Sequence, residues 1–420
     1  MATPLVGVYG FGKPGHAIEM HSENVELIGS GSGPGRVWMT LDCDLDIRWE
    51  IDLQRHVGLG ERQLRLRRPD LGEVDIPAWV TNSAGYGDVR RASFSSEAPL
   101  RHVVVHWVNL PQILPGERLT SDGHNWAGRW QCDAAGWSLT LDSRPDLTDV
   151  LPDLKSSRRF ALTHVAELRR TDDATFTADE AADTLFGFQL AISFALGRWV
   201  APSLPVGFDS AGQRAWEQWA PWRCDSYGGF HGWWDTQTDD ALANLVRRFL
   251  GAWSDPDERD VVRHLALHAI TANHRGTTLE GRIMLAQAGV EFLSWITSVL
   301  CGQMTRKQFK KRPADEHLRA LLVNASIPAE VPGDLAALKD FAATKGVDGP
   351  QAVIWVRNRL VHPKDSGEPY RIDNLVLHAW QLSMHYVQLL LLHRLGYDGP
   401  YLPPFPPGRF AHDSEAVPWV

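Results

Sequence analysis

The chain has 420 residues, a length typical of two or three domains, with ample material for a buried core. Hydrophobic residues make up 44% and charged residues 22% of the sequence, values that exclude wholesale disorder and fibrous repeats. The formal net charge of -9 excludes a global positive field that would attract nucleic acid, so any such binding must be local.

Cysteine spacing and hydropathy indicate the compartment. The four cysteines are far apart and form no CxxC pair, which is typical of reduced thiols in a cytoplasmic protein and excludes a cysteine zinc site. No stretch approaches the roughly eighteen unbroken apolar residues of a membrane helix, and the first residues lack the features of a signal peptide. We therefore expect a soluble cytoplasmic protein without membrane association.

The first 155 residues have the pattern of β-strands. Apolar and polar residues alternate almost strictly from Leu41 to Leu53, which predicts one long half-buried strand. Shorter apolar runs before Ser30 and at 76–80, 102–108 and 137–141 are separated by Gly, Pro, Asn and Asp. This spacing predicts an antiparallel sandwich or a barrel-like sheet.

Residues 156–235 have mixed character and complete a predicted β-rich N-terminal domain over 1–235. A strand-like run at 160–168 precedes Thr177 and Glu180, whose spacing is that of a capping box. We expect this box to open an apolar helix that continues to Leu196. Most of the 18 tryptophans fall before Pro256, in this front half of the chain.

The remainder has the period of α-helices. Apolar residues recur at helical spacing in segments at 242–249, 262–269, 278–304, 315–323, 333–344, 351–361 and 372–395. We predict an α+β protein in which an all-α domain at 236–397, with its core at 279–395, follows the β-rich domain. The tail at 398–420 is rich in proline and is expected to be extended.

Three patterns suggest ligands but have simpler explanations. Gly10, Gly12 and Gly15 match GxGxxG, yet Pro14 and the short polar segment that follows favour a turn over a dinucleotide fold. The acidic series Asp42, Asp44 and Asp46 has no glycine at the sixth position of a calcium loop, so we expect a solvated strand face.

The third pattern is a histidine pair. His264 and His268 are four residues apart and could bind a metal from one helical face, but Leu265 stands where a zincin has glutamate. Bound zinc would support a metallohydrolase. The polar face of a helix is the simpler interpretation, and we expect no metal and no cofactor.

The segment Val356 to Pro363, VRNRLVHP, carries the most informative residues. It ends a predicted helix whose buried side is Val353, Val356 and Leu360. Asn358 and His362 are four residues apart and share a face, and the long side chain of Arg357 can reach the same point. An ion pair between Arg357 and a nearby acid, with His362 merely ending the helix, is the alternative interpretation.

These three residue types suit phosphodiester chemistry without a metal. A guanidinium offers a planar fork of donors to phosphate oxygens, and an imidazole exchanges protons near neutral pH. RNA carries its own nucleophile in the 2′-hydroxyl. Since one imidazole cannot easily serve both sides of an in-line displacement, a two-fold dimer with two facing motifs is attractive.

The motif RNRLVH, from Arg357 to His362, resembles the signature of the HEPN superfamily: Arg, a polar residue, and His four to six positions after the Arg. The earlier helix RIMLAQAGVEFLSWI, which contains Glu291, is similar to the family's opening helix, and the resemblance covers about 279–395. The β-rich front half followed by helices is similar to the layout of ApeA-type anti-phage proteins.

The resemblance implies a HEPN-type helical bundle and a metal-independent endoribonuclease in phage defence or toxin roles, acting as a homodimer through the helical domain. Its substrate would be RNA, with tRNA one candidate, and its products 2′,3′-cyclic phosphates. Arg357 would bind the phosphate, Asn358 would orient it or His362, and His362 would transfer protons. The β-rich domain would restrain cleavage until a trigger, such as a phage component, arrives.

A basic cluster follows the long helix and adds a candidate RNA contact. The alternative interpretation of this cluster is a solvated helix end. Phe309 in its midst could stack on a base or belong to the core. A catalytically inactive HEPN-like scaffold that binds nucleotide or RNA, or that only dimerises, is the competing function. The candidate RNA-binding residues are Arg306, Lys307, Lys310, Lys311, Arg312 and, within the motif, Arg359.

Overall fold

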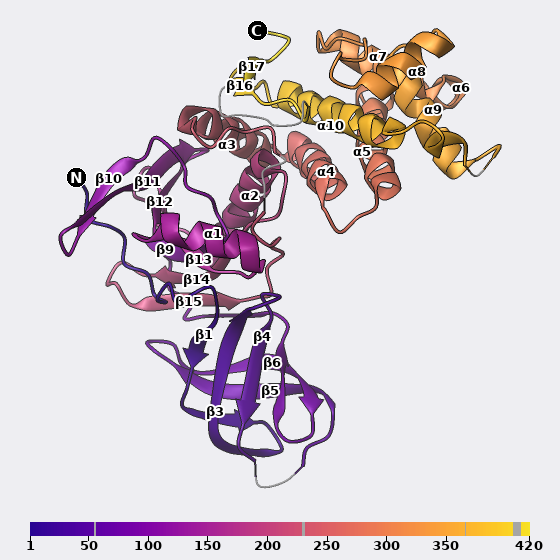
Figure 1. The fold of residues 1–420 in the computed structure, drawn as a ribbon. Coiled ribbons are helices and arrows are strands. Elements are labelled where there is room, and N and C mark those ends of the chain that lie inside the picture. The colour runs from indigo at the N-terminus through magenta and orange to yellow at the C-terminus, as the bar shows by residue number, and fades with distance from the viewer. Residues whose placement is uncertain (54–55, 229–231, 366, 406–412) are drawn as a thin grey trace. The chain divides into compact units, whose positions relative to one another are not determined.

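The computed structural model describes residues 1–53, 56–228, 232–365, 367–405 and 413–420 (Figure 1). The chain divides into two compact units, the first formed by 1–189 with 199–229 and the second by 190–198 with 230–420. A β-rich N-terminal half precedes a helical C-terminal half, which confirms the predicted α+β class.

The first unit begins with a closed antiparallel barrel. Its strands follow the order β1-β3-β2-β5-β6-β7-β4, and an additional pairing between β3 and β4 closes the ring. Alternate side chains such as Leu64, Leu66 and Trp49 are buried in its core. The strands are β1 (Gly15–His21), β2 (Asn24–Leu27), β3 (Gly31–Leu41), β4 (Ile47–Ile51), β5 (Gly60–Arg68), β6 (Gly72–Asn82) and β7 (Tyr86–Val89).

The predicted single strand from Leu41 to Leu53 is wrong. Strand β3 ends at Leu41, and β4 returns beside it with Ile47 opposite Met39. The carboxylate of Asp44 accepts hydrogen bonds from the hydroxyl of Thr40 and from the backbone N–H of Asp46, the latter at 3.3 Å. The acidic series therefore builds a turn, since an aspartate side chain can hold the backbone two residues on.

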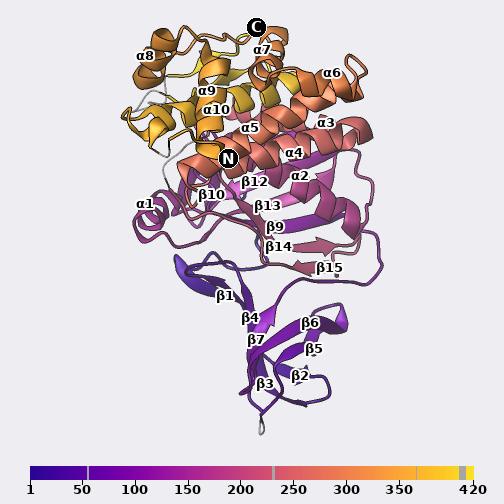
Figure 2. The ribbon, with the colours of Figure 1, turned by 90° about the vertical axis from the view of Figure 1, so that its right-hand side faces the viewer.

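An eight-stranded antiparallel sheet forms the rest of the first unit (Figure 2). Its order is β10-β11-β12-β13-β9-β14-β15-β8. The predicted strand at 102–108 coincides with β9, whereas β14 and β15 were not predicted. The strands are β8 (Ala92–Ser95), β9 (His102–Val108), β10 (Glu117–Ser121), β11 (His124–Ala134), β12 (Trp137–Ser143), β13 (Leu162–Arg170), β14 (Ala201–Phe208) and β15 (Arg214–Trp219).

Two helices are inserted between these strands, α1 (Leu147–Ser157) and α2 (Ala178–Leu196). The predicted capping box opens α2: the backbone N–H of Thr177 donates to the carboxylate of Glu180 at 2.8 Å, and the N–H of Glu180 donates to the hydroxyl of Thr177 at 3.2 Å. The barrel and the sheet share one hydrophobic core, which includes Trp49 and Trp219.

A buried ion pair also links the barrel to the sheet. Arg68 of β5 donates to the carboxylate of Glu217 of β15 at 2.7 and 3.2 Å, and their side chains are only 4% and 0% exposed. Arg214 donates to the same carboxylate at 3.0 Å, and the guanidinium of Arg68 lies over the ring of Trp219. Burial, reinforced by Glu217, raises the pKa of Tyr9 in this cluster to about 12.

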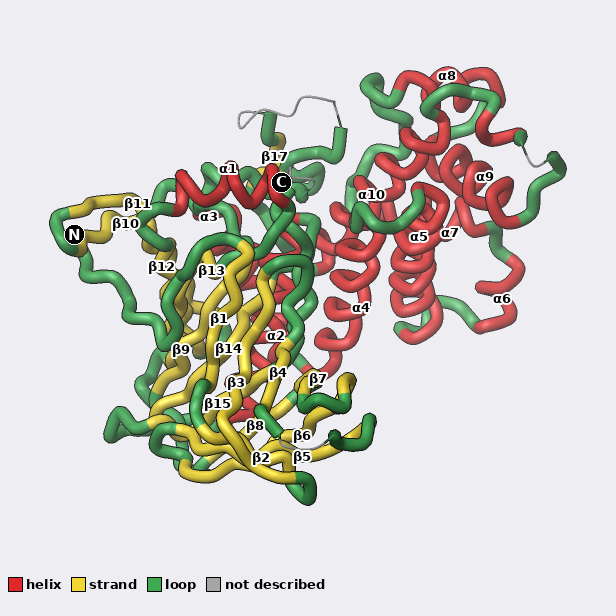
Figure 3. Tube along the Cα trace, turned by 60° about the horizontal axis from the view of Figure 1, so that its bottom comes forward, coloured by secondary structure: helices red, strands yellow, loops and turns green. Residues whose placement is uncertain are grey.

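The second unit is helical (Figure 3). The largely buried α10 packs against α4, α5, α8 and α9, and a π-helical turn, Ile296–Leu300, directly continues α5. The short strands Pro400–Tyr401 and Glu415–Ala416 pair in the tail. The helices are α3 (Asp239–Ser254), α4 (Pro256–Asn273), α5 (Leu279–Trp295), α6 (Arg306–Lys311), α7 (Ala314–Asn324), α8 (Ala336–Lys345), α9 (Gly349–Val361) and α10 (Leu375–Arg394).

Two helical segments of the described chain are long and apolar enough to cross a membrane by length and composition alone, Leu279–Leu300 and Leu375–Arg394. The core helix of a folded domain meets the same criterion, and 78% of the apolar window of the second segment is buried inside the protein. These helices are therefore weak evidence for a membrane span.

Candidate active site

Helix α9 places the predicted motif, and its N-terminus is firmly held. Asp348 accepts a hydrogen bond from the backbone N–H of Gln351 at 3.0 Å, and Arg319 of α7 donates to both oxygens of the same carboxylate at 2.7 and 3.0 Å. Although burial opposes it, the hydrogen bonds from Arg319 and Gln351 lower the pKa of Asp348. Val353 and Val356 are fully buried, as predicted, whereas Leu360, expected on the same buried side, is half-buried.

The three motif residues lie at the end of this helix. Arg357 is half-buried, whereas Asn358 and His362 are exposed. The guanidinium of Arg357 donates to the side-chain carbonyl of Asn358 at 3.1 Å, and the backbone N–H of His362 donates to the carbonyl of Asn358 at 2.7 Å. His362 therefore ends the helix through its backbone, and within the described residues its imidazole makes no hydrogen bond.

Arg357 and Arg359 differ in their ion pairing. Over the described part of the chain, no carboxylate lies within ion-pair distance of its guanidinium. The next arginine, Arg359, has the ion pair instead: it lies 3.1 Å from the carboxylate of Glu368 and over the ring of Trp355. Among the described residues, the alternative interpretation, an ion pair between Arg357 and a nearby acid, is therefore wrong. Arg359 already has such an ion pair, with Glu368.

Tyr370, which follows the motif in the chain, makes a hydrogen bond to α5. The hydroxyl of Tyr370 donates to the carboxylate of Glu280, at the start of α5, at 2.6 Å. This hydrogen bond raises the pKa of Tyr370 to about 12 and lowers the pKa of Glu280. Together with the Arg359–Glu368 ion pair, it links Tyr370 to α5 and Glu368 to α9.

The predicted basic cluster forms the short helix α6 and its C-terminus. Arg312 is half-buried and lies 3.3 Å from the carboxylate of Glu316. Phe309 is buried between the rings of Trp295 and His317, at centroid distances of 5.0 and 3.9 Å, so it belongs to the core. The exposed members are Arg306, Lys307, Lys310 and Lys311.

A pocket of about 390 Å³ brings the motif and the basic cluster together. Arg357 from α9 lines it with Lys310 and Arg312, so three cations from distant parts of the sequence meet there. Asn358, His362 and the other predicted RNA-binding residues lie outside its lining. The Arg357 pocket, as we call it, is lined by Gln287, Val290, Glu291, Ser294, Trp295, Phe309, Lys310, Arg312, Ala314, His317, Leu318, Ile354 and Arg357.

Several of these residues were not predicted as part of a site. A polar stripe runs along α5, which is otherwise apolar from Ile283 onward. It is formed at helical spacing by Gln287, Glu291 and Ser294. That stripe was the available signal, because a polar stripe on a core helix indicates something other than packing. His317 gave no such signal, since it lies between unremarkable helical residues.

The glycine pattern at 10–15 and the pair of histidines in α4 have structural explanations. Gly12 and Gly15 adopt positive φ values of 60° and 78°, and strand β1 rather than a helix follows them, in agreement with a turn. Among the described residues, no group of three or more His, Cys, Asp or Glu side chains is arranged to hold a metal ion. A ring nitrogen of His264 lies 2.6 Å from the carbonyl oxygen of Asp260 within its own helix.

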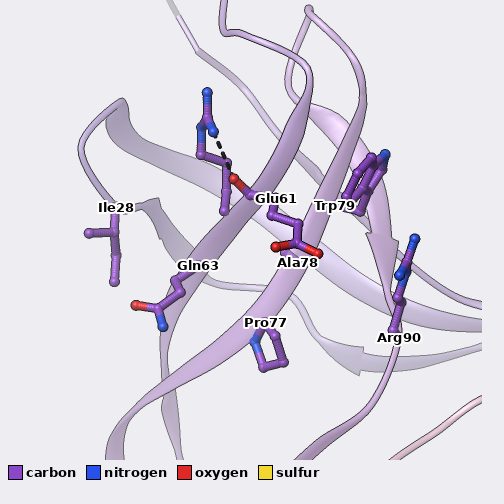
Figure 4. A pocket seen from close by; sticks show the side chains of 8 residues that line it. Ile28, Glu61, Gln63, Pro77, Ala78, Trp79 and Arg90 are labelled. Atoms are coloured by element: carbon purple, nitrogen blue, oxygen red, sulfur yellow. Dashed lines mark hydrogen bonds between the residues drawn. The ribbon is translucent and has the colours of Figure 1, made fainter.

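A second pocket, of about 500 Å³, lies on the barrel (Figure 4). The guanidinium of Arg90 lies 4.9 Å from the ring centre of Trp79, and Arg62 donates to the backbone carbonyl of Glu61 at 2.7 Å. Ile28, Gln63, Pro77 and Ala78 complete its lining. None of the predicted site residues lies in this pocket.

Two protein-family models match the chain. They are described as "YopA central domain", which matches residues 95–229, and "YopA C-terminal domain", which matches residues 255–413. The chain resembles YopA. It is 26% identical over 331 residues to the "SPbeta prophage-derived uncharacterized protein YopA" of Bacillus subtilis (strain 168), an alignment that covers 77% of this chain and 73% of the relative. No solved structure matches the chain. The RNRLVH motif and the Arg357 pocket both fall within the C-terminal match.

Proposed function

We propose that the protein is a metal-independent endoribonuclease of the HEPN type. The observation that carries the proposal is Arg357, a guanidinium without a carboxylate partner among the described residues, which lines one pocket with Lys310 and Arg312. A local group of cations in a chain of net charge -9 favours a specific phosphate site over general attraction of nucleic acid.

The chemistry follows from the residue types. Arg357 would bind the non-bridging phosphate oxygens, and Asn358, which accepts a hydrogen bond from it, would hold the guanidinium in place. The exposed imidazole of His362 would move a proton to or from the reacting oxygens. The 2′-oxygen attacks the adjacent phosphorus, the 5′-oxygen leaves, and the products are a 2′,3′-cyclic phosphate and a 5′-hydroxyl.

The assembly and the setting are part of the proposal. A second imidazole on the other side of the phosphate would come from a second copy, so we propose a homodimer through the helical domain. The prophage origin in the relative's name supports a phage-related setting. We place the protein in the cytoplasm, as an anti-phage effector whose β-rich unit receives the trigger.

The test is cleavage of total RNA by the purified chain in EDTA, with and without lysate from phage-infected cells. We expect cleavage by the wild type and a loss of roughly 100-fold or more in His362→Ala and Arg357→Ala. His264→Ala is the matched control, because this exposed histidine lies outside the Arg357 pocket. Absence of cleavage under every condition, or equal cleavage by His362→Ala, would overturn the proposal, and RNA binding without cleavage would indicate a scaffold.

A further inference from the structure

We propose that the Arg357 pocket binds the nucleoside beside the scissile phosphate and thereby selects the base at which RNA is cut. The inference rests on the proposed function, because it assigns a specificity subsite to the same active site. It adds residues of α5 and α6 that the motif itself does not contain.

The charges of the pocket fit a phosphate at one side of the ligand. The lining contains three cations, Arg357, Lys310 and Arg312, and one carboxylate, that of Glu291. Of the three cations, only Arg312 has an ion pair among the described residues, with Glu316. Lys310 is exposed on α6 and so remains free to reach a ligand. An anion that approaches Arg357 therefore meets a second cation within the same pocket.

The aromatic wall of the pocket fits a planar ring. Trp295 is half-buried and packs edge-on against Phe309, which in turn stacks on His317. Nε2 of His317 lies 3.0 Å from the carbonyl oxygen of Phe309, so Nε2 carries the proton and donates. These contacts fix the wall before any ligand binds, and the volume of about 390 Å³ lies in the range of small-molecule sites.

Two acceptors in the pocket point to a ring that donates hydrogen bonds. Glu291 is exposed, and a carboxylate would repel the phosphate, so it suits another part of the ligand. Nδ1 of His317 is buried in the wall without a hydrogen-bond partner. An anionic group joined to an aromatic ring with N–H donors is a nucleotide, and guanine offers two adjacent N–H groups to one carboxylate. We therefore expect a preference for guanine.

The test is calorimetric titration of the full-length His362→Ala chain, which should not cleave, with the four nucleoside 3′-monophosphates and with inorganic phosphate. We expect 3′-GMP to bind most tightly. Lys310→Ala should weaken all four nucleotides by about tenfold, the loss of one charge-assisted contact. Lys345→Ala, an exposed lysine at the end of α8 that lies outside the pocket and outside the basic cluster, should leave binding unchanged.

Glu291→Gln should abolish the preference for 3′-GMP while retaining binding of the other nucleotides, and a circular dichroism spectrum verifies that the variant is folded. Phosphate binding as tight as that of 3′-GMP, or equal effects of Lys345→Ala and Lys310→Ala, would overturn the inference.

The two proposals can fail separately. RNA cleavage without nucleotide binding, and with cleavage positions unchanged in Glu291→Gln, would overturn the base pocket and leave the endoribonuclease standing. Nucleotide binding with the expected variant pattern, but without RNA cleavage by the wild type, would overturn the endoribonuclease and support the ligand chemistry of the pocket.

Discussion

Replacing Glu217 by alanine should destabilise the first unit strongly. The carboxylate is fully buried and accepts hydrogen bonds from Arg68 at 2.7 and 3.2 Å and from Arg214 at 3.0 Å. Its removal leaves the guanidinium of Arg68, only 4% exposed, without its counter-ion. Loss of one partner of such a buried pair costs about 3–5 kcal/mol. For a unit of this size, that corresponds to a fall in Tm of roughly 10 °C.

The assay is urea unfolding followed by tryptophan fluorescence. Glu50→Ala is the matched control, because the Arg36–Glu50 pair joins neighbouring strands of the same unit but is about half exposed, and should cost less than about 1 kcal/mol. The double variant Arg68→Met/Glu217→Leu should recover much of the loss, since it leaves no buried charge unpaired between these two positions. A Glu217→Ala variant within 1 kcal/mol of the wild type would refute the reasoning.

Two further predictions concern a helix cap and two buried histidines. Asp348→Ala should lower the free energy of unfolding of the second unit by roughly 2 kcal/mol, because α9 loses its cap and Arg319 retains only its longer contact with Asp315; an unchanged urea midpoint would contradict this. Burial lowers the pKa of His106 to about 4 and of His164 to about 3, so both are neutral when folded and gain protons on unfolding below pH 6.5. Stability therefore falls as the pH drops below 6.5, and the loss is complete only below the folded pKa values of about 4 and 3. The urea midpoint should drop between pH 7 and pH 4.5, with a smaller drop in His164→Gln.

Local signals in the sequence predicted much of the fold. The apolar run at 102–108 became β9, and Thr177 with Glu180 opened α2, because both depend on residues close in sequence. The alternation from Leu41 to Leu53 misled because a turn with acidic residues at alternate positions keeps the same two-residue period. The hydrogen bonds of Asp44, and that from the backbone N–H of Thr40 to the carbonyl of Asp46 at 2.9 Å, close the turn in the structure.

The candidate site was predictable only in part. The position of Arg357 at the end of a helix follows from apolar periodicity and from Pro363. Which of two nearby arginines pairs with an acid depends on where Glu368 lies after the loop, and no local rule determines that. The meeting of Lys310 with Arg357 depends on the packing of α5, α7 and α9, which links residues far apart in sequence.

The π-helical turn at Ile296–Leu300 makes the Arg357 pocket sensitive to chain length as well as to side-chain identity. The turn directly follows Trp295 of α5 and is connected to α6 by residues 301–305. Since α5 and α6 both contribute lining residues, the turn determines how α6 is placed relative to α5. Deleting one residue there would restore the α-helical register and rotate the following chain by about 100°. The short connection 301–305 would have to absorb that rotation, or Lys310 and Arg312 would leave the lining. Insertions and deletions at this turn are therefore a route by which related chains could change the ligand of the pocket without replacing a lining residue.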